Sequence, residues 1–340
     1  MNMDELIRLE QRMLEPSAAL IEDVSRIKGD ILLLGVAGKM GPTMARVARK
    51  AVDAAGTGQR VIGVSRFSNP ASRVELEEVG VETISANLLD DQELASLPDA
   101  PNVIYLAGHK FGTTGNESYT WAMNTYLPGR VADKYRNSNI VAFSSGNVLP
   151  FVPVTSGGAS EEVAPEPIGE YAQSCLGRER IFEYFSEKNG TPIFIYRLNY
   201  AVDFRYGVIL EIAKSVFQGK PIDLRTENVN VIWQGDANEI AIRSLLHCES
   251  PAKVVNVTGP ETLSIRWIAR QFGMLLDKEP QFVNEPQGTA LLNNASECHR
   301  LFGYPRVTVR EIIELTAKWL LGGGEQLDKP THFQERAGKF

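Results

Sequence analysis

The chain contains few of the residues that mark several common protein classes. Its three cysteines, Cys175, Cys248 and Cys298, are odd in number and widely spaced, so they suggest neither a disulfide framework nor a zinc site. His247 and His299 stand beside two of them, but too few other ligands lie near in the sequence to indicate a metal centre. We therefore expect free thiols and no metal.

The charge and the hydropathy pattern exclude further classes. The 340 residues carry 35 basic and 42 acidic side chains, and the formal charge of −7 offers no basic surface for nucleic acid. No apolar run approaches the length of a membrane span, and the acidic start lacks the basic and apolar parts of a secretion signal. The sequence thus favours a cytoplasmic protein with no membrane or nucleic-acid partner, and its length favours about two domains.

Three glycines, Gly35, Gly38 and Gly41, directly follow the apolar run at residues 31–34. The run predicts a buried parallel strand, and the proline-initiated segment after the last glycine predicts a helix. Glycines at such a turn let the backbone approach a pyrophosphate, whose charge then lies against free amides at the helix N-terminus. The pattern predicts a dinucleotide-binding turn, and a glycine-rich structural turn is the alternative.

Short apolar strands alternate with helix-like segments after this turn. We expect these strands at residues 61–64, 81–84, 103–106 and 140–143. The alternation predicts an α/β fold, a Rossmann-type doubly wound parallel sheet covered by helices on both faces. We divide the chain into an N-terminal helical extension (1–28), an NAD(P)-binding Rossmann domain (29–200), a mainly substrate-binding part (201–322) and a C-terminal tail (323–340).

The order of the motifs resembles that of the extended short-chain dehydrogenase/reductase superfamily, specifically its NAD-dependent epimerase/dehydratase family. The likeness runs from about residue 29 to 321. It rests on GVAGKMG at the glycine turn, NLLD, YLAG, SSGNV, the helix that begins at Tyr171, and then TPIFIYRLN, FQGKPIDL, VVNVTGP and LFGYP. The resemblance implies the fold above with a smaller C-terminal substrate-binding part, an NAD(P) cofactor and a polyhydroxylated small-molecule substrate. A homodimer is a possible assembly.

The resemblance also implies roles for individual residues. Ser145 and Tyr171 take the places of the family's catalytic serine and tyrosine. The residues implied to contact the cofactor are Gly35, Gly38, Lys39, Met40, Gly41, Ser65, Arg66, Asn87, Leu88, Leu106, Ala107, Gly108, Asn124 and Tyr171.

One position departs from the family's YxxxK motif, because Cys175 stands where the lysine is expected. In the family that lysine lowers the tyrosine pKa. Without such help Tyr171 would have a pKa near ~10 and would be a poor base at neutral pH. Arg178 follows two turns later, roughly 10 Å along the helix axis, and is badly placed to substitute. Lys110, beside His109 in the loop after the fourth strand, is our candidate for the replacement cation, and a basic surface pair is the alternative.

The end of the second strand bears on the choice of cofactor. NAD sites usually place a carboxylate there for the ribose hydroxyls, whereas NADP sites replace it and add an arginine for the 2′-phosphate. Ser65 and Arg66 stand at this turn, with no acid. The sequence therefore favours NADP, and NAD with the arginine stacked on adenine is the alternative.

The second half lacks contacts that nucleotide-sugar enzymes of this family make. Valine occupies the place of an arginine that precedes Asp236, and Asn199 follows Arg197 by two residues where the family has three. Both changes remove diphosphate contacts, so a sugar or a sugar acid fits as well as a nucleotide sugar. Asn199, Trp233 and Gln234 are candidate substrate residues, and a packed tryptophan and a surface glutamine are the alternatives.

Two classes of function fit these observations. The first is an NAD(P)-dependent epimerase/dehydratase-like oxidoreductase or isomerase that acts on a carbohydrate or sugar acid. The second is a non-catalytic NAD(P)-binding sensor, which has no chemical need for the pair Ser145 and Tyr171. The enzyme is therefore favoured. The tail after Leu321, which contains His332, predicts a solvated terminus, and a strap over a partner subunit or a pocket is the alternative.

Overall fold

The computed structural model describes residues 7–8, 11–12, 14–327 and 331–339. A seven-stranded parallel sheet dominates the fold, with its strands in the spatial order β12 (Lys253–Val257), β7 (Ile193–Leu198), β5 (Asn139–Ser145), β4 (Asn102–Tyr105), β1 (Ile31–Leu34), β2 (Val61–Ser65) and β3 (Glu82–Ser85). The order reverses between β1 and β4, as in doubly wound dinucleotide-binding folds. This confirms the predicted Rossmann-type α/β fold.

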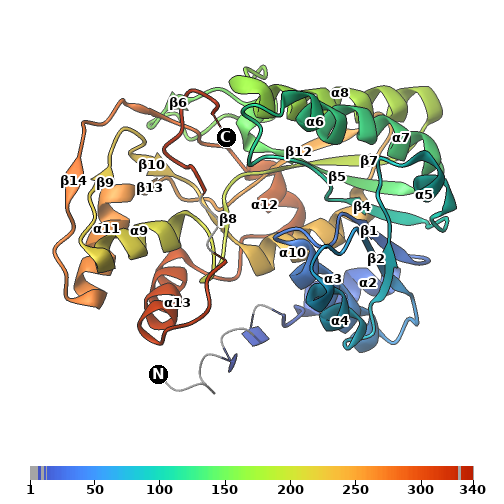
Figure 1. The fold of residues 1–340 in the computed structure, drawn as a ribbon, viewed down its shortest axis with the longest axis horizontal. Helices are drawn as coiled ribbons and strands as arrows, with labels where there is room; N and C mark the ends of the chain where they lie inside the picture. Colours follow the sequence, from blue (N-terminus) through green and yellow to red (C-terminus); the bar gives the residue numbers. More distant parts are fainter. Residues whose placement is uncertain (1–6, 9–10, 13, 328–330, 340) are drawn as a thin grey trace.

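Helices cover both faces of the sheet (Figure 1). One face packs against α2 (Ala18–Arg26), α3 (Gly41–Ala55), α10 (Gln234–Arg243) and α12 (Ser296–Phe302). The other packs against α5 (Asp91–Ser96), α7 (Leu127–Lys134) and α8 (Gly169–Asn189). Strand β1 is buried throughout, because Ile31 and Leu33 belong to the first core while Leu32 and Leu34 belong to the second. Buried residues on both faces explain why the strands read as continuous apolar runs.

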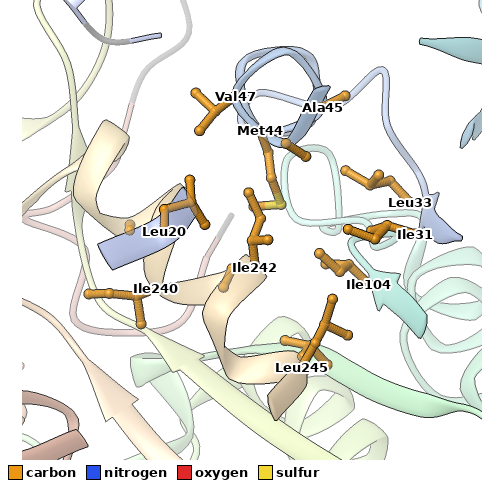
Figure 2. Packing of buried hydrophobic residues seen from close by; sticks show 14 of the residues in the cluster. Leu20, Ile31, Leu33, Met44, Ala45, Val47, Ile104, Ile240, Ile242 and Leu245 are labelled. Atoms are coloured by element: carbon orange, nitrogen blue, oxygen red, sulfur yellow. The ribbon is translucent and has the colours of Figure 1, made fainter. Parts of the chain in front are cut away.

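Figure 2 shows how the first core joins segments far apart in the sequence. Ile242 of α10 lies beside Met44 of α3, and Ile31 and Leu33 of β1 lie next to them, whereas Ile240 lies nearer to Leu20. Leu20 of α2 packs into the same cluster. The C-terminal half of the chain therefore helps to hold the helix that follows the glycine turn.

A second core lies beyond the carboxyl ends of the strands. Its main helices are α9 (Val208–Gln218), α11 (Ile265–Leu276) and α13 (Val309–Leu321), which bury Ile212, Phe272 and Ile312 between them. Short strand pairs border it: β6 (Val152–Pro153) with β15 (Thr289–Ala290), β8 (Ala201–Val202) with β11 (Ile232–Trp233), β9 (Ile222–Asp223) with β14 (Phe282–Val283), and β10 (Asn228–Val229) with β13 (Leu263–Ser264). The chain returns to the main sheet at β12, and the proposed division at residue 200 stays a prediction.

The remaining helices are short. They are α4 (Pro70–Glu77), α6 (Glu117–Trp121), the π-helical turn η1 (Ala122–Tyr126) and the 3₁₀ turns η2 (Gly146–Val148) and η3 (Ser244–His247). None of the described helices is long and apolar enough to cross a membrane. Of the predicted N-terminal extension, α2 is described, whereas residues 1–6, 9–10 and 13 lie outside the described residues.

The C-terminal segment passes between the two parts of the molecule (Figure 1). The Leu327 amide donates to the Arg205 carbonyl at 3.1 Å, and further on the Arg336 side chain donates to the Thr289 carbonyl at 2.8 Å. At its far end Gly338 approaches Gly169 at the start of α8 so closely that neither position has room for a Cβ. Residues 331–339 are thus packed against the protein, in agreement with the strap alternative and against a frayed, solvated end.

Candidate active site

The glycine turn connects β1 to α3 and requires two of its three glycines for its own shape. Gly35 has a φ of +91°, and a Cβ there would lie 2.7 Å from the Ala107 amide nitrogen. A Cβ on Gly41 would lie 2.0 Å from the Val36 carbonyl oxygen. At Gly38 a Cβ would meet only the Gly35 carbonyl oxygen, at 3.4 Å, so this glycine leaves open space for a ligand.

The beginning of α3 is suited to an anion. Met40 takes the N-cap position, and its side chain makes no capping hydrogen bond. The first amides of this 15-residue helix are therefore left to a ligand or to water, and the helix dipole favours negative charge at this place. Turn and helix together fit the pyrophosphate of a dinucleotide.

A cavity of about 640 Å³ opens from this turn toward the second core. It lies outside the carboxyl ends of the strands, where the topology of such sheets places ligands. Of the predicted site residues it is lined by Gly35, Gly38, Lys39, Met40, Gly41, Leu106, Gly108, Lys110, Ser145, Tyr171, Asn199 and Gln234. Residues far apart in the sequence thus share one wall, although Ser65, Arg66, Asn87, Leu88, Ala107, Asn124 and Trp233 are not part of it.

Ser145 and Tyr171 meet in this cavity. Ser145 ends β5 and Tyr171 lies in the first turn of α8, and the two hydroxyl groups come close enough for Ser145 to lower the pKa of the phenol. The Ser145 hydroxyl itself donates to Asn147 Oδ1 at 2.9 Å. The pKa of Tyr171 is raised above its usual value, first by desolvation and then by Cys175, against the opposing influence of Arg178 and Ser145. The phenol is therefore protonated at neutral pH and can donate a hydrogen bond or a proton.

Cys175 lies one turn below Tyr171 and is fully buried. It packs with Val148, Leu149 and Ala159 in a small apolar cluster. Burial raises its thiol pKa, so the thiol is neutral and supplies no charge to Tyr171. The family's lysine is thus replaced by a core residue.

Arg178 reaches the site, contrary to its expected remoteness. The side chain lines the cavity, and its guanidinium donates to the Phe143 carbonyl at 2.7 Å and to Asn124 Oδ1 at 2.7 Å. Its charge lowers the pKa of Tyr171. The helix spacing alone misjudged this residue, because side chains lean toward the helix N-terminus and an arginine spans more than one turn.

Lys110 also lies near the phenol. Its Nζ is 5.2 Å from the centre of the Tyr171 ring and 5.5 Å from that of Phe111. Desolvation lowers the pKa of Lys110 to about 8, although Cys175 and Glu211 oppose this shift. The ammonium group thus lies near the Tyr171 ring, whereas the cation whose charge lowers the pKa of Tyr171 is Arg178, and the role of Lys110 as the replacement cation stays a prediction.

Asn124 lies behind the cavity wall, in the π-helical turn η1. It is fully buried, accepts from the His109 amide at 2.8 Å and donates to the His109 carbonyl at 2.8 Å and to the Ser174 hydroxyl. Because it also accepts from Arg178, it fixes the loop that carries Lys110 to the helix that carries the guanidinium. Its visible role is to position other groups.

The ends of β2 and β3 lie along the sheet from the cavity. Arg66 is exposed just after Ser65, and no acidic residue stands between Val61 and Asn69. The Asn87 amide donates to Glu93, and the Leu88 side chain is buried. The end of β2 therefore carries a positive charge and lacks the carboxylate typical of NAD sites.

The three candidate substrate residues have different surroundings. Asn199 and Gln234 line the cavity, where Gln234 donates to Thr43 Oγ1 at 3.0 Å. Trp233 is 2% exposed and packs against Phe204 in the second core, with ring centres 5.7 Å apart. It therefore has the environment of a packed tryptophan.

The C-terminal segment contributes to the cavity two residues that were not among the site residues predicted from the sequence. Thr331 and His332 line the wall, and Thr331 Oγ1 donates to Glu211 Oε2 at 2.6 Å. Their contribution depends on contacts over 120 positions in sequence, so no local motif could have indicated it. No cluster of three histidine, cysteine or acidic residues suited to a metal occurs in the described part of the chain, and all three cysteines are free.

No family model and no curated protein sequence matches the chain. Solved structures do resemble it. A UDP-glucuronic acid 4-epimerase variant from Bacillus cereus, in complex with a fluorinated UDP-glucuronic acid and NAD, has a TM-score of 0.71 at 18% identity over 86% of this chain and 99% of that one.

Two further structures show the same likeness. An epimerase from Methanothermobacter thermautotrophicus gives a TM-score of 0.72 at 18% identity over 90% and 96% of the two chains. UDP-glucose 4-epimerase from Thermotoga maritima, with UDP-glucose, gives 0.69 at 17% over 86% and 99%. These structures confirm the predicted fold, which the chain shares with these epimerases.

Proposed function

We propose that this chain is an NAD(P)-dependent enzyme that acts on a hydroxyl group of a carbohydrate or sugar acid, as epimerases and dehydratases do. One observation carries the proposal: the neighbouring Ser145 and Tyr171 side chains share a cavity with the glycine turn. A sensor of the cofactor would need the turn alone, whereas a paired serine and tyrosine serve proton transfer.

The residues around the turn fit a dinucleotide. Gly38 leaves room for the backbone to approach a pyrophosphate, and the uncapped amides of α3 favour its charge. The structures of similar fold from Bacillus cereus contain NAD. Arg66, at a strand end without a carboxylate, supports a preference of this chain for NADP.

When bound, the nicotinamide supplies a hydride acceptor. In our proposal Ser145 Oγ donates a hydrogen bond to the reacting substrate oxygen, and Tyr171 Oη exchanges its proton with that oxygen. Lys110 provides the charge that the missing family lysine would provide. Its Nζ lies 5.2 Å from the centre of the Tyr171 ring, and an opposite charge at about such a distance lowers the pKa of an acid by roughly 1–3 units.

Two arginines that could bind a nucleotide diphosphate are already paired with acidic side chains, which supports a substrate without that group. Arg197 is buried and donates to Glu179 Oε2 at 2.7 Å, so its charge is already paired. Arg225 is paired with Asp223 at 2.5 Å and does not line the cavity. The UDP-sugar complexes of similar fold therefore supply the reaction type for our proposal, and a free sugar or sugar acid is the proposed substrate class.

The test is a titration with NAD and NADP followed by a screen of sugars and sugar acids for reduction of the bound nicotinamide. We expect saturable cofactor binding and at least one compound that is oxidised. A chain that binds neither dinucleotide would contradict the proposal. Tight cofactor binding with no reaction of any carbohydrate would favour the sensor.

A further inference from the structure

The cavity wall is positively charged in an acidic protein. The described residues that line it include the cations Lys39, Lys110 and Arg178 together with His109 and His332, which count as neutral, and no lining residue is aspartate or glutamate. The whole chain has a formal charge of −7. Cations gathered in a cleft of a protein of opposite net charge point to an anionic ligand.

Three of these basic groups surround a single aromatic ring. The Nζ atoms of Lys39 and Lys110 lie 4.3 Å and 5.5 Å from the centre of the Phe111 ring, and the His332 ring centre lies 5.8 Å from it. The aromatic face offers each ammonium group a weak attraction. The three groups therefore share one part of the cavity wall.

The backbone holds His332 at this place in an uncommon conformation. Its φ is +54°, which is unusual for a residue other than glycine, and both neighbours are anchored. Thr331 is bonded to Glu211, and Phe333 is 3% exposed within the second core. Backbone strain that the surroundings impose at a cavity wall is typical of functional positions.

We propose that Lys110 and His332 bind an anionic group of the substrate, a carboxylate or a phosphate, with Lys39 adding its charge from the glycine turn. The proposal rests on the proposed function, since it takes Ser145 and Tyr171 as the reacting end of the cavity. Lys110 lies near both the phenol and Phe111, so the anion would orient the substrate beside Tyr171. The imidazole can donate a hydrogen bond in either tautomer.

The lowered pKa of Lys110 agrees with this arrangement. Desolvation lowers it to about 8, and a bound anion would favour the charged form again. The groups that face this ammonium are Tyr171 and Cys175 on α8, Glu211 on α9 and His332 on the C-terminal segment. Glu211 is the one acidic group among them, and it is bonded to Thr331 behind the wall.

The test is calorimetric binding of three probes to the full chain saturated with NAD: D-glucuronate, glucose 6-phosphate and glucose. We expect at least one of the anionic probes to bind ~10-fold or more tightly than glucose. A preference for glucuronate identifies a sugar acid, and a preference for glucose 6-phosphate identifies a sugar phosphate. If neither anion binds more tightly than glucose, the proposal is wrong.

Variants connect the preference to its residues. Lys110→Met and His332→Asn should each remove most of the preference for anions, and Asn tolerates the positive φ at that position. Lys110→Arg should retain it, and Lys318→Met, at an exposed position of α13 outside the cavity, is the matched control. Unchanged preference in folded Lys110→Met and His332→Asn variants would overturn the proposal.

The same experiment separates this inference from the proposed function. If NAD does not bind, the chain is saturated with NADP instead. Failure of both dinucleotides to bind contradicts the proposed function, and the probes are then titrated into the chain alone. If Lys110→Met weakens NAD binding while anions and glucose bind alike, the basic cluster serves the dinucleotide and the inference fails.

Discussion

Two glycines of one turn should respond in opposite ways to the same substitution. A Cβ at Gly38 would meet only a carbonyl oxygen at 3.4 Å, which is an ordinary contact, and its φ is not positive. Gly38→Ala should therefore leave the free energy of unfolding unchanged or raise it by about 0.4–1 kcal/mol through the unfolded chain. A Cβ at Gly41 would lie 2.0 Å from the Val36 carbonyl oxygen, so Gly41→Ala should destabilise the protein by several kcal/mol.

Dinucleotide binding should separate the two variants further. The methyl group of Gly38→Ala occupies the space through which the pyrophosphate approaches the amides of α3, so the dissociation constant for NAD or NADP should rise ~10²-fold while the melting temperature is kept. Calorimetric titration and thermal unfolding of the same samples measure both effects. Wild-type affinity in a stable Gly38→Ala variant would refute our interpretation of the turn.

Three further predictions concern charged side chains. Lys110→Met should lower kcat/KM by roughly 10- to 10³-fold, because a nearby charge that lowers the pKa of Tyr171 by roughly 1–3 units is lost. The pKa of Lys110 is lowered to about 8, so the turnover of the wild type should fall as the pH rises through 8 and the ammonium group loses its charge. The pH–rate profile of Lys110→Met should lack this fall, which checks that Lys110 causes it. Arg66→Ala should remove most of any preference for NADP, which dissociation constants for both cofactors measure. If the wild type binds NAD more tightly than NADP, an arginine at this strand end does not indicate NADP in this chain. Arg197→Met should lower the free energy of unfolding by about 3–5 kcal/mol, because Glu179 would keep a buried, unpaired charge. Urea unfolding measures this change. A decrease below about 1 kcal/mol would contradict the importance of the Arg197–Glu179 pair.

The parts of the fold that depend on local pattern could be predicted from the sequence. The run at 31–34 is β1, and the predicted strands at 61–64, 81–84, 103–106 and 140–143 agree with β2 to β5 within two residues at each end. Proline near the start of α3 and Gly56 with a φ of 64° at its end explain why its bounds were readable. Apolar periodicity and caps are properties of neighbouring residues, so one sequence suffices for them.

The parts of the site that depend on the length of a side chain or on contacts between distant residues could not be predicted from the sequence. The helix rise separates the Cα atoms of Arg178 and Tyr171 by two turns, but the Arg178 side chain extends back along the helix to Asn124 and Phe143. His332 enters the cavity because Thr331 bonds to Glu211 and Phe333 enters the second core. Neither contact leaves a periodic signal in the sequence.

The central claim is that Tyr171 exchanges a proton with a substrate held beside Ser145. The most direct measurement compares wild type and Tyr171→Phe for single-turnover reduction of bound NAD(P) by a substrate found in the carbohydrate screen. We expect the rate to fall by ~10² or more with cofactor affinity nearly unchanged, because the substitution removes only a proton-transfer group. An unchanged rate in the folded variant would contradict the account.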